Sequence, residues 1–208
     1  MLIFSLISDP LQFLEFVIAL LVAITIHEAS HAWVANLYGD PTAKMQGRIT
    51  LNPIAHLDPL GTIFLLLAGF GWGKPVNVNP NNFHNPKLDN LTVALAGPIS
   101  NLVLAIILGL VLRFVNLPEA IGQLFIITIF FNLVLMIFNL IPIPPLDGSK
   151  ILGLFLKEET YIYFQQVGIT ILFIVIIFSS FFYPILPEFM TRAVTFFFTL
   201  ITGKSISL

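Results

Sequence analysis

The sequence contains no cysteine among its 208 residues, and only 10% of its residues are charged. Without cysteine there are no disulfide bonds, no thiolate catalysis and no cysteine-ligated zinc, so any metal ion must be bound by His, Asp or Glu. A typical soluble domain is about 25% charged. The scarcity of charge, together with 57% hydrophobic residues and a mean hydropathy of +0.97, excludes a water-soluble globular protein and a disordered chain.

The few charges also limit the partners of the protein. The net charge is −2 and no basic stripe is present, so nucleic acid is excluded as a partner and the lipid bilayer is expected as the surrounding solvent. The first ten residues carry no Lys or Arg. The apolar stretch that follows is therefore interpreted as a retained membrane helix and not as a signal peptide.

Apolar stretches predict the fold, because about 20 apolar residues cross a bilayer. Four stretches are long enough, and two shorter ones are read as re-entrant, tilted or interfacial. The sequence predicts an all-α, polytopic bundle of about four to six transmembrane helices with a small re-entrant β/loop region. We expect a single membrane-embedded domain over 1–208, with a catalytic core at about 11–150 and C-terminal helices at about 161–203. The four long stretches are 11–38, 88–112, 121–141 and 161–182, and the two short ones are 60–70 and 189–201.

The polar region between the first two spans contains a candidate strand. Val76 and Val78 alternate with asparagines between Pro75 and Pro80, which predicts a short edge strand. The loops after the first and third spans also carry most of the basic residues. If 60–70 does not cross, the positive-inside rule places both loops in the cytoplasm and the N-terminus outside. These basic residues are Lys44, Arg48, Lys74, Lys87, Lys150 and Lys157.

A candidate metal site lies near the inner end of the first span. His27 and His31 are four residues apart on one helix face, so both imidazoles can reach one ion. Glu28 is placed to exchange a proton with a water molecule at the open position. The plain alternative is a pair of helix histidines that only bond to their neighbours. Ionisable side chains inside an apolar span are costly and usually functional, which favours a metal site over this alternative. Zinc is the expected ion, because catalytic zinc sites use three N or O ligands and keep one position for water.

Two histidines are not enough for a catalytic zinc site, so a third ligand is required. Asp147 follows three prolines that end the third span, and it is the only carboxylate in that segment. It is either the third ligand or an N-cap of the helix that starts near Lys150. Asn101 lies in the second span at a depth similar to that of the histidines. It is either a donor to a developing oxyanion or one half of a helix-to-helix hydrogen bond.

These motifs, in this order, resemble the site-2 protease family of intramembrane zinc metallopeptidases, in its compact branch without PDZ or CBS domains. The resemblance extends over most of the chain. It rests on His27-Glu28-x-x-His31, Gly97-Pro98-x-x-Asn101 and Leu146-Asp147-Gly148, and on the shorter motifs at 50–53, 56–59 and 71–75.

The resemblance implies one Zn²⁺ per chain, with His27, His31 and Asp147 as ligands and Glu28 as general base. It implies that Asn101 positions the substrate or stabilises the transition state. The implied activity is hydrolysis of peptide bonds in or near transmembrane segments of other proteins, in a multi-pass cell-membrane protein with its active site facing the cytoplasm. A substrate helix must unwind first, and the 75–80 strand is a candidate edge for it.

Two other functions use the same ligands. A membrane metal carrier or sensor would bind zinc without hydrolysis, but it has no need of Glu28 and would show polar residues along several helices or an inverted repeat. An inactive scaffold that grips transmembrane helices is the other alternative, and the intact motif residues argue against it.

Overall fold

The computed structural model describes residues 8–68 and 71–205 of the chain, and most of them are helical. Within this part, five helices are long and apolar enough to cross a membrane: α2, α5, α6, α8 and α9. This number confirms the predicted polytopic helical bundle. The elements in chain order are α2 (Pro10–Leu37), α3 (Thr42–Met45), η1 (Pro53–His56), α4 (Pro59–Ala68), η2 (Pro80–Asn82), α5 (Pro86–Phe114), α6 (Glu119–Asn139), α7 (Ser149–Phe155), α8 (Glu158–Phe181) and α9 (Ile185–Thr202).

The four predicted spans correspond to α2, α5, α6 and α8. Of the two shorter stretches, 189–201 lies within α9, whose 18 residues are enough to span by length and composition. The stretch 60–70 forms α4 up to Ala68, and its last two residues lie outside the described part. With 10 residues, α4 is only about 15 Å long, which is too short to cross a bilayer.

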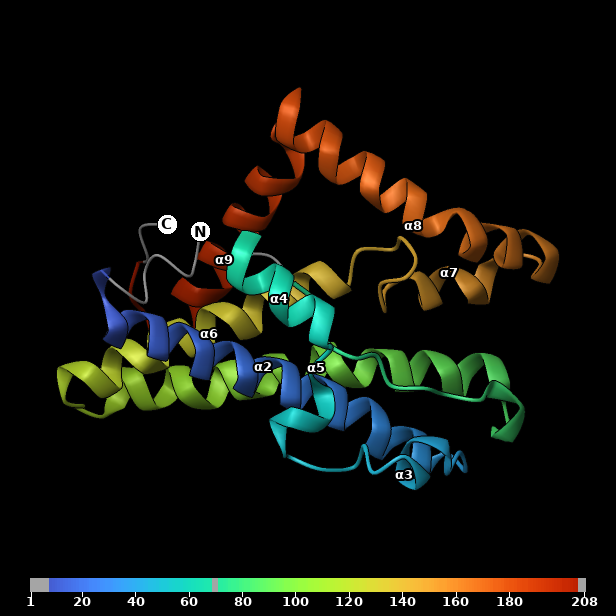
Figure 1. The fold of residues 1–208 in the computed structure, drawn as a ribbon, viewed down its shortest axis with the longest axis horizontal. Coiled ribbons are helices and arrows are strands. Elements are labelled where there is room, and N and C mark those ends of the chain that lie inside the picture. The colour runs from blue at the N-terminus through green and yellow to red at the C-terminus, as the bar shows by residue number, and fades with distance from the viewer. Residues whose placement is uncertain (1–7, 69–70, 206–208) are drawn as a thin grey trace.

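The core of the bundle lies between α5, α6 and α9, while α2 packs along α5 and α6 (Figure 1). Buried apolar side chains from three helices meet there, including Ala105, Ile129, Leu133 and Val194. The α8 helix stands away from this core and contacts only α7 and α9 among the described helices. The metal motif on α2 therefore faces the tightly packed half of the molecule.

The direction of α9 departs from simple alternation of spans. Its last turn lies beside the C-terminal end of α5, with Ile201 against Gly109 and Gly203 against Arg113. Thus α9 runs parallel to α5, although a fifth alternating span would run antiparallel to it. In Figure 1, α8 and α9 together lead from the end of the bundle near α7 to the opposite end.

Proline and short polar side chains set the boundaries of the two longest helices. Asp9 accepts a hydrogen bond from the backbone N–H of Gln12 before α2, and Asn85 caps α5 in the same way. A proline follows each cap at the first helical position, where the missing N–H costs nothing. These signals are local, so both helix starts are readable from the sequence.

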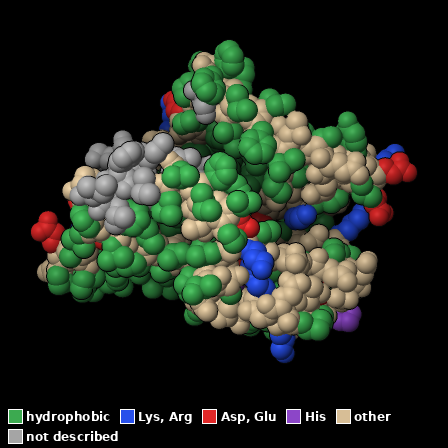
Figure 2. Space-filling model, viewed as in Figure 1, with side chains coloured by type: hydrophobic (Ala, Val, Ile, Leu, Met, Phe, Trp, Pro, Cys, Tyr) green, Lys and Arg blue, Asp and Glu red, His purple; other side chains and the backbone are tan. Residues whose placement is uncertain are grey.

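The polar region between α2 and α5 is a folded loop and not a sheet. Among the described residues, its one β contact is an isolated antiparallel bridge between Leu57 and Gly73. The predicted strand at 75–80 pairs with no strand in the described part of the chain, so it is a single segment running beside α2. Most of the face seen in Figure 2 is covered by hydrophobic side chains, while Lys and Arg gather toward one end.

Candidate metal centre

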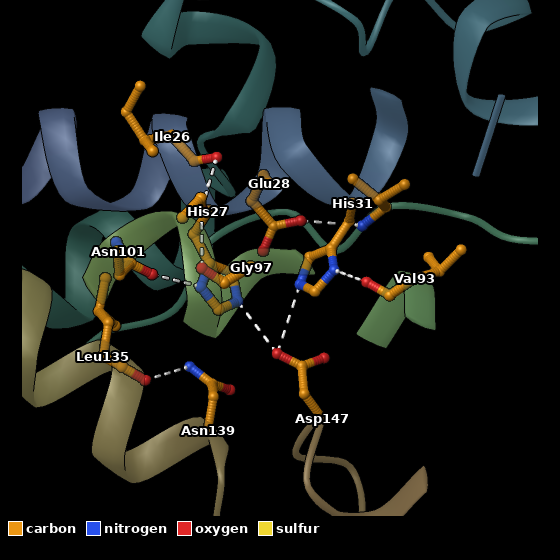
Figure 3. Close-up of polar contacts among 12 residues, drawn as sticks. Ile26, His27, Glu28, His31, Val93, Gly97, Asn101, Leu135, Asn139 and Asp147 are labelled. Carbon is orange, nitrogen blue, oxygen red and sulfur yellow. Dashed lines mark hydrogen bonds and ion pairs between the residues drawn. The ribbon is translucent and has the colours of Figure 1, made fainter. Parts of the chain in front are cut away.

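Two buried imidazoles from α2 form one side of the site (Figure 3). His27 and His31 are one helical turn apart, their ring centroids are 4.6 Å apart, and the rings are nearly perpendicular. The Nδ1 atom of His31 lies 2.7 Å from the carbonyl oxygen of Val93, and the Nδ1 atom of His27 lies 2.6 Å from Oδ1 of Asn101. Each ring is thus held from the side opposite the site.

Asp147 completes the group from a segment far away in sequence. Its Oδ2 atom lies 3.1 Å from Nε2 of His27 and 3.3 Å from Nε2 of His31. The segment can approach so closely because α6 ends at Asn139, and the backbone N–H of Gly148 then donates to the Asn139 carbonyl at 2.7 Å. A Cβ on Gly148 would lie 2.2 Å from the Leu140 carbonyl oxygen, so only glycine fits there.

The distances from Asp147 to the two imidazoles fit a tetrahedral metal ion. Zinc bonds of about 2.0–2.1 Å hold neighbouring ligand atoms about 3.3 Å apart. The two distances from Asp147 to the imidazoles are close to this value, and all three ligand atoms lie within 4.8 Å of one another. The residues predicted as ligands are therefore brought together.

The hydrogen bonds behind the two imidazoles also favour a metal ion between His27, His31 and Asp147. A backbone carbonyl can only accept, so the Val93 contact requires a hydrogen on Nδ1 of His31, and the neutral imidazole then carries its lone pair on Nε2. The Nδ1 atom of His27 likewise faces an oxygen, Oδ1 of Asn101. With both imidazoles neutral, two lone pairs and a carboxylate oxygen face one another, and a cation bound among them would satisfy all three.

A close approach of α5 to α2 leaves room for the ligands. A Cβ built on Gly97 would lie 2.5 Å from Nε2 of His31 and 2.7 Å from Nε2 of His27. Real Cβ atoms essentially never come so close to another heavy atom. Gly97 therefore forms the wall of the site directly beside the two ligand atoms, and any side chain there would fill the space of the ion.

Glu28 lies beside the ligands with partners of its own. Its Oε2 atom accepts a hydrogen bond from the backbone N–H of Val76 at 3.1 Å and lies 3.8 Å from Nη2 of Arg48. The Glu28 and Asp147 side chains are 15% and 19% exposed, against 7% and 9% for the imidazoles of His27 and His31. The site is therefore closed on its imidazole side and open to water on its carboxylate side.

Arg48 is a buried cation that sequence reasoning counted only as a loop charge. Its Nη1 and Nη2 atoms donate to the carbonyls of Pro75 and Lys74 at 3.0 and 2.5 Å. Burial lowers the pKa of the Arg48 guanidinium, and the charge of Glu28 partly offsets that effect. The side chain ties the 74–76 backbone to the site. No signal in the sequence separated Arg48 from the other basic loop residues.

Two other polar residues of the loop, His56 and Asp40, are buried and hydrogen-bonded within it. His56 is fully buried, and its Nε2–H donates to the Thr50 carbonyl at 2.8 Å, while His84 is exposed. Asp40 is also fully buried, and it accepts hydrogen bonds from the backbone N–H of Asn79 and from the Asn82 amide, both at 2.7 Å. Asp40 therefore anchors the loop, because its carboxylate oxygens are buried together with the N–H groups that donate to them.

Asn101 lies behind His27, and its amide is fully engaged. Its two N–H bonds donate to the carbonyl of Ala23 at 3.0 Å and to Oδ1 of Asn132 at 2.7 Å. Donation by Asn101 to an oxyanion stays a prediction. In this arrangement Asn101 has no free N–H with which to donate. Asn132 was not recognised in the sequence, because a lone asparagine in an apolar span carries no spacing signal.

Comparison with known proteins matches this chain to a peptidase family and to relatives named "Putative zinc metalloprotease". A sequence model of Peptidase family M50 matches residues 15–123 and 117–182. "Putative zinc metalloprotease YwhC" of Bacillus subtilis is 48% identical over 153 residues, which are 69% of this chain and 70% of that protein. "Putative zinc metalloprotease Rip2" of Mycolicibacterium smegmatis is 35% identical over 146 residues, 67% of this chain and 56% of that protein. The chain thus spans a little over half of the mycobacterial relative. No solved structure matches the chain.

Proposed function

The chain belongs to peptidase family M50 and is a zinc metallopeptidase, and from this premise we propose that it hydrolyses peptide bonds in or near transmembrane segments of other membrane proteins. The observation that carries the proposal is the location of the metal-binding group. Two of its ligands lie inside α2, a helix apolar enough to cross the bilayer. A substrate that reaches them must be able to enter the membrane. We propose a single peptidase domain, since α2, α5, α6 and α9 pack into one bundle.

His27, His31 and Asp147 would hold the zinc ion. When bound, zinc supplies a Lewis acid that activates a water molecule and polarises a peptide carbonyl. Glu28 accepts the proton of the attacking water and later delivers it to the departing nitrogen. The Val76 N–H and the Arg48 guanidinium hold the Glu28 carboxylate in place for both transfers.

We further propose that the 74–79 segment receives the unwound substrate as an added strand. Its ends are anchored by buried charges, Arg48 at the carbonyls of Lys74 and Pro75 and Asp40 at the N–H of Asn79. Between these anchors, no hydrogen bond within the described residues engages the backbone N–H of residues 77 and 78 or the carbonyl of residue 76. These groups are available to a peptide lying beside Glu28.

The distribution of charge supports a cytoplasmic active site. The end of the bundle where α2 stops and α5 and α8 begin carries six of the nine basic residues, whereas the opposite end carries Arg113 and Lys204, and Arg192 lies within α9. Figure 2 shows the basic side chains gathered at the first of these ends. By the positive-inside rule, this end and the carboxylate side of the metal centre face the cytoplasm.

The test compares the wild type with Glu28→Gln, which keeps the shape of the side chain but cannot act as a base. We expect equal zinc content, and cleavage of a membrane-spanning test peptide reduced by about 10²–10⁴-fold in the variant. Glu119→Gln, at an exposed site in the first turn of α6, is the matched control and should cleave normally. Equal zinc with no cleavage in either protein would instead indicate a carrier or scaffold.

A second test addresses the proposed binding of substrate to the 74–79 segment. Val76→Pro would also remove the hydrogen bond to Glu28, so Val78→Pro is the cleaner variant. We expect it to lower kcat/KM about tenfold, because one backbone donor of the edge is lost. Val78→Ala, which keeps the N–H but loses packing against the buried cluster of Ala35, Phe83 and Val93, is the control. Unchanged cleavage by Val78→Pro would contradict the added strand.

A further inference from the structure

Two fully buried asparagines from different helices form a polar chain that ends on a metal ligand. Asn101 on α5 and Asn132 on α6 are both 0% exposed, in a region otherwise filled with apolar side chains. Asn132 Nδ2 donates to the Thr128 carbonyl at 2.8 Å, and Asn101 Nδ2 donates to Oδ1 of Asn132 at 2.7 Å. Oδ1 of Asn101 then faces Nδ1 of His27 at 2.6 Å.

The direction of this chain is fixed at its far end. The Thr128 carbonyl can only accept, so the Asn132 amide must turn its N–H toward Thr128 and its oxygen toward Asn101. Asn101 must then donate to Asn132, and its second N–H donates to the Ala23 carbonyl, another obligate acceptor. Only the oxygen of Asn101 remains for His27.

This direction determines which nitrogen of His27 carries the hydrogen. An oxygen facing Nδ1 requires an N–H there, which leaves the lone pair on Nε2, the atom that faces Asp147. A reversed Asn101 would present its N–H groups to Nδ1 and move the hydrogen to Nε2. Nε2 would then be unable to bind a metal ion.

We propose that Asn132, acting through Asn101, is a positioning residue that sets the tautomer of His27 and thereby the zinc affinity of the centre. Asn132 touches none of the three ligands, so its effect passes wholly through the orientation of one amide. The inference rests on the metal centre that the proposed function uses, but not on peptide cleavage. It is therefore tested by zinc binding alone.

A role limited to helix packing makes a different prediction. Buried amides that only join α5 to α6 would lose stability when replaced, with no effect on the metal beyond general loosening. The positioning role predicts energetic coupling: without Asn101 there is no amide to orient, so the loss of Asn132 should have no additional effect on zinc affinity.

The experiment measures the zinc Kd of the purified full chain in detergent by competition with a chromogenic chelator. The variants are Asn101→Ala, Asn132→Leu and the double variant, and Leu is chosen to preserve the side-chain volume at 132. Contacts behind metal ligands typically change affinity 10–100-fold. We expect Asn101→Ala to raise the Kd by that factor, Asn132→Leu to raise it about tenfold, and the double variant to bind no more weakly than Asn101→Ala.

The matched control is Thr128→Val, because only the backbone carbonyl of Thr128 belongs to the chain and its hydroxyl donates elsewhere, to the Leu124 carbonyl. It should bind zinc normally. The absorption spectrum of bound Co²⁺ should also change in Asn132→Leu but not in Thr128→Val, since a displaced imidazole alters the ligand geometry.

Three results would overturn the inference. They are a wild-type zinc Kd in folded Asn132→Leu, a wild-type Kd in Asn101→Ala, or additive losses in the double variant. A wild-type Kd in Asn101→Ala refutes the inference even if Asn132→Leu does not fold. A wild type that binds no zinc would instead contradict the proposed function.

Discussion

Replacing Gly97 by alanine gives a direct test of the metal centre, because α5 approaches the ligands there without a side chain. The added Cβ would lie 2.5 Å from Nε2 of His31, and ordinary contact begins at 3.4 Å, so the helix or the imidazole must retreat by about 0.9 Å. Ligand distances in metal sites hold to about 0.2 Å. The required displacement is several times larger, and it falls on His27 as well.

We therefore expect Gly97→Ala to weaken zinc binding by more than the roughly 100-fold that replacing a contact behind a ligand can cost. Cleavage should fall with it. The assay is the zinc Kd by chelator competition, followed by cleavage of a membrane-spanning peptide at saturating zinc. Gly122→Ala is the control, since a Cβ at Gly122 meets nothing within 4 Å and alanine favours the helix by about 0.5–1 kcal/mol.

A role of Gly97 in helix packing alone would give a different result. Close contact of α2 and α5 through small residues is common in membrane proteins without any metal. If Gly97 served only that purpose, alanine would lower the thermal stability and leave the zinc Kd of the folded protein unchanged. That outcome would refute the placement of the ion beside Gly97.

Three further predictions follow from the loop and the ligands. Arg48→Met should reduce kcat/KM about tenfold or more, since hydrogen bonds from a charged donor contribute about 1.5–3 kcal/mol each, but it should leave the zinc Kd unchanged. Burial alone would raise the pKa of Asp40, yet hydrogen bonds from Thr42, Asn79 and Asn82 outweigh it and lower the pKa below its usual value. The stabilisation by Asp40 is therefore complete above the unfolded pKa of about 3.9 and is lost as pH falls through the folded value. Limited proteolysis near 79–82 should increase in acid, and Asp40→Asn should be cleaved there even at pH 7. Zinc at about 100 times its Kd should stabilise the folded chain by about 2.7 kcal/mol, and His31→Ala should lose this increment in thermal unfolding.

The parts of the fold that follow from local chemistry were predictable. The spans appear as runs of apolar residues, and the starts of α2 and α5 carry the cap-plus-proline signature. The helical spacing of His27 and His31 places both rings on one face before any tertiary contact is known. These features depend on residues close together in the sequence.

Features that depend on tertiary packing were not predictable. Val76 and Val78 alternate as in a strand, but no strand within residues 8–68 and 71–205 pairs with them, and the segment is held by Arg48 and Asp40 instead. The parallel course of α9 follows from contacts such as Ile201 against Gly109, and neither hydropathy nor charge encodes them. Asn132 was missed for the same reason: its function depends on Asn101, which is 31 residues away.

The way each ligand is held also distinguishes a resident ion from a transported one. A carrier must release its ion, so its ligands need freedom to reorient along a polar path. Here His31 is held by the Val93 carbonyl and His27 by Asn101, and Asp147 follows a turn closed by the hydrogen bond from Gly148 N–H to the Asn139 carbonyl. The two proposed imidazole ligands are thus hydrogen-bonded on the side away from the site, and the carboxylate of Glu28 is held separately by Val76 and Arg48. A retained ion with a proton acceptor beside it is what hydrolysis requires, and it is a poor arrangement for transport.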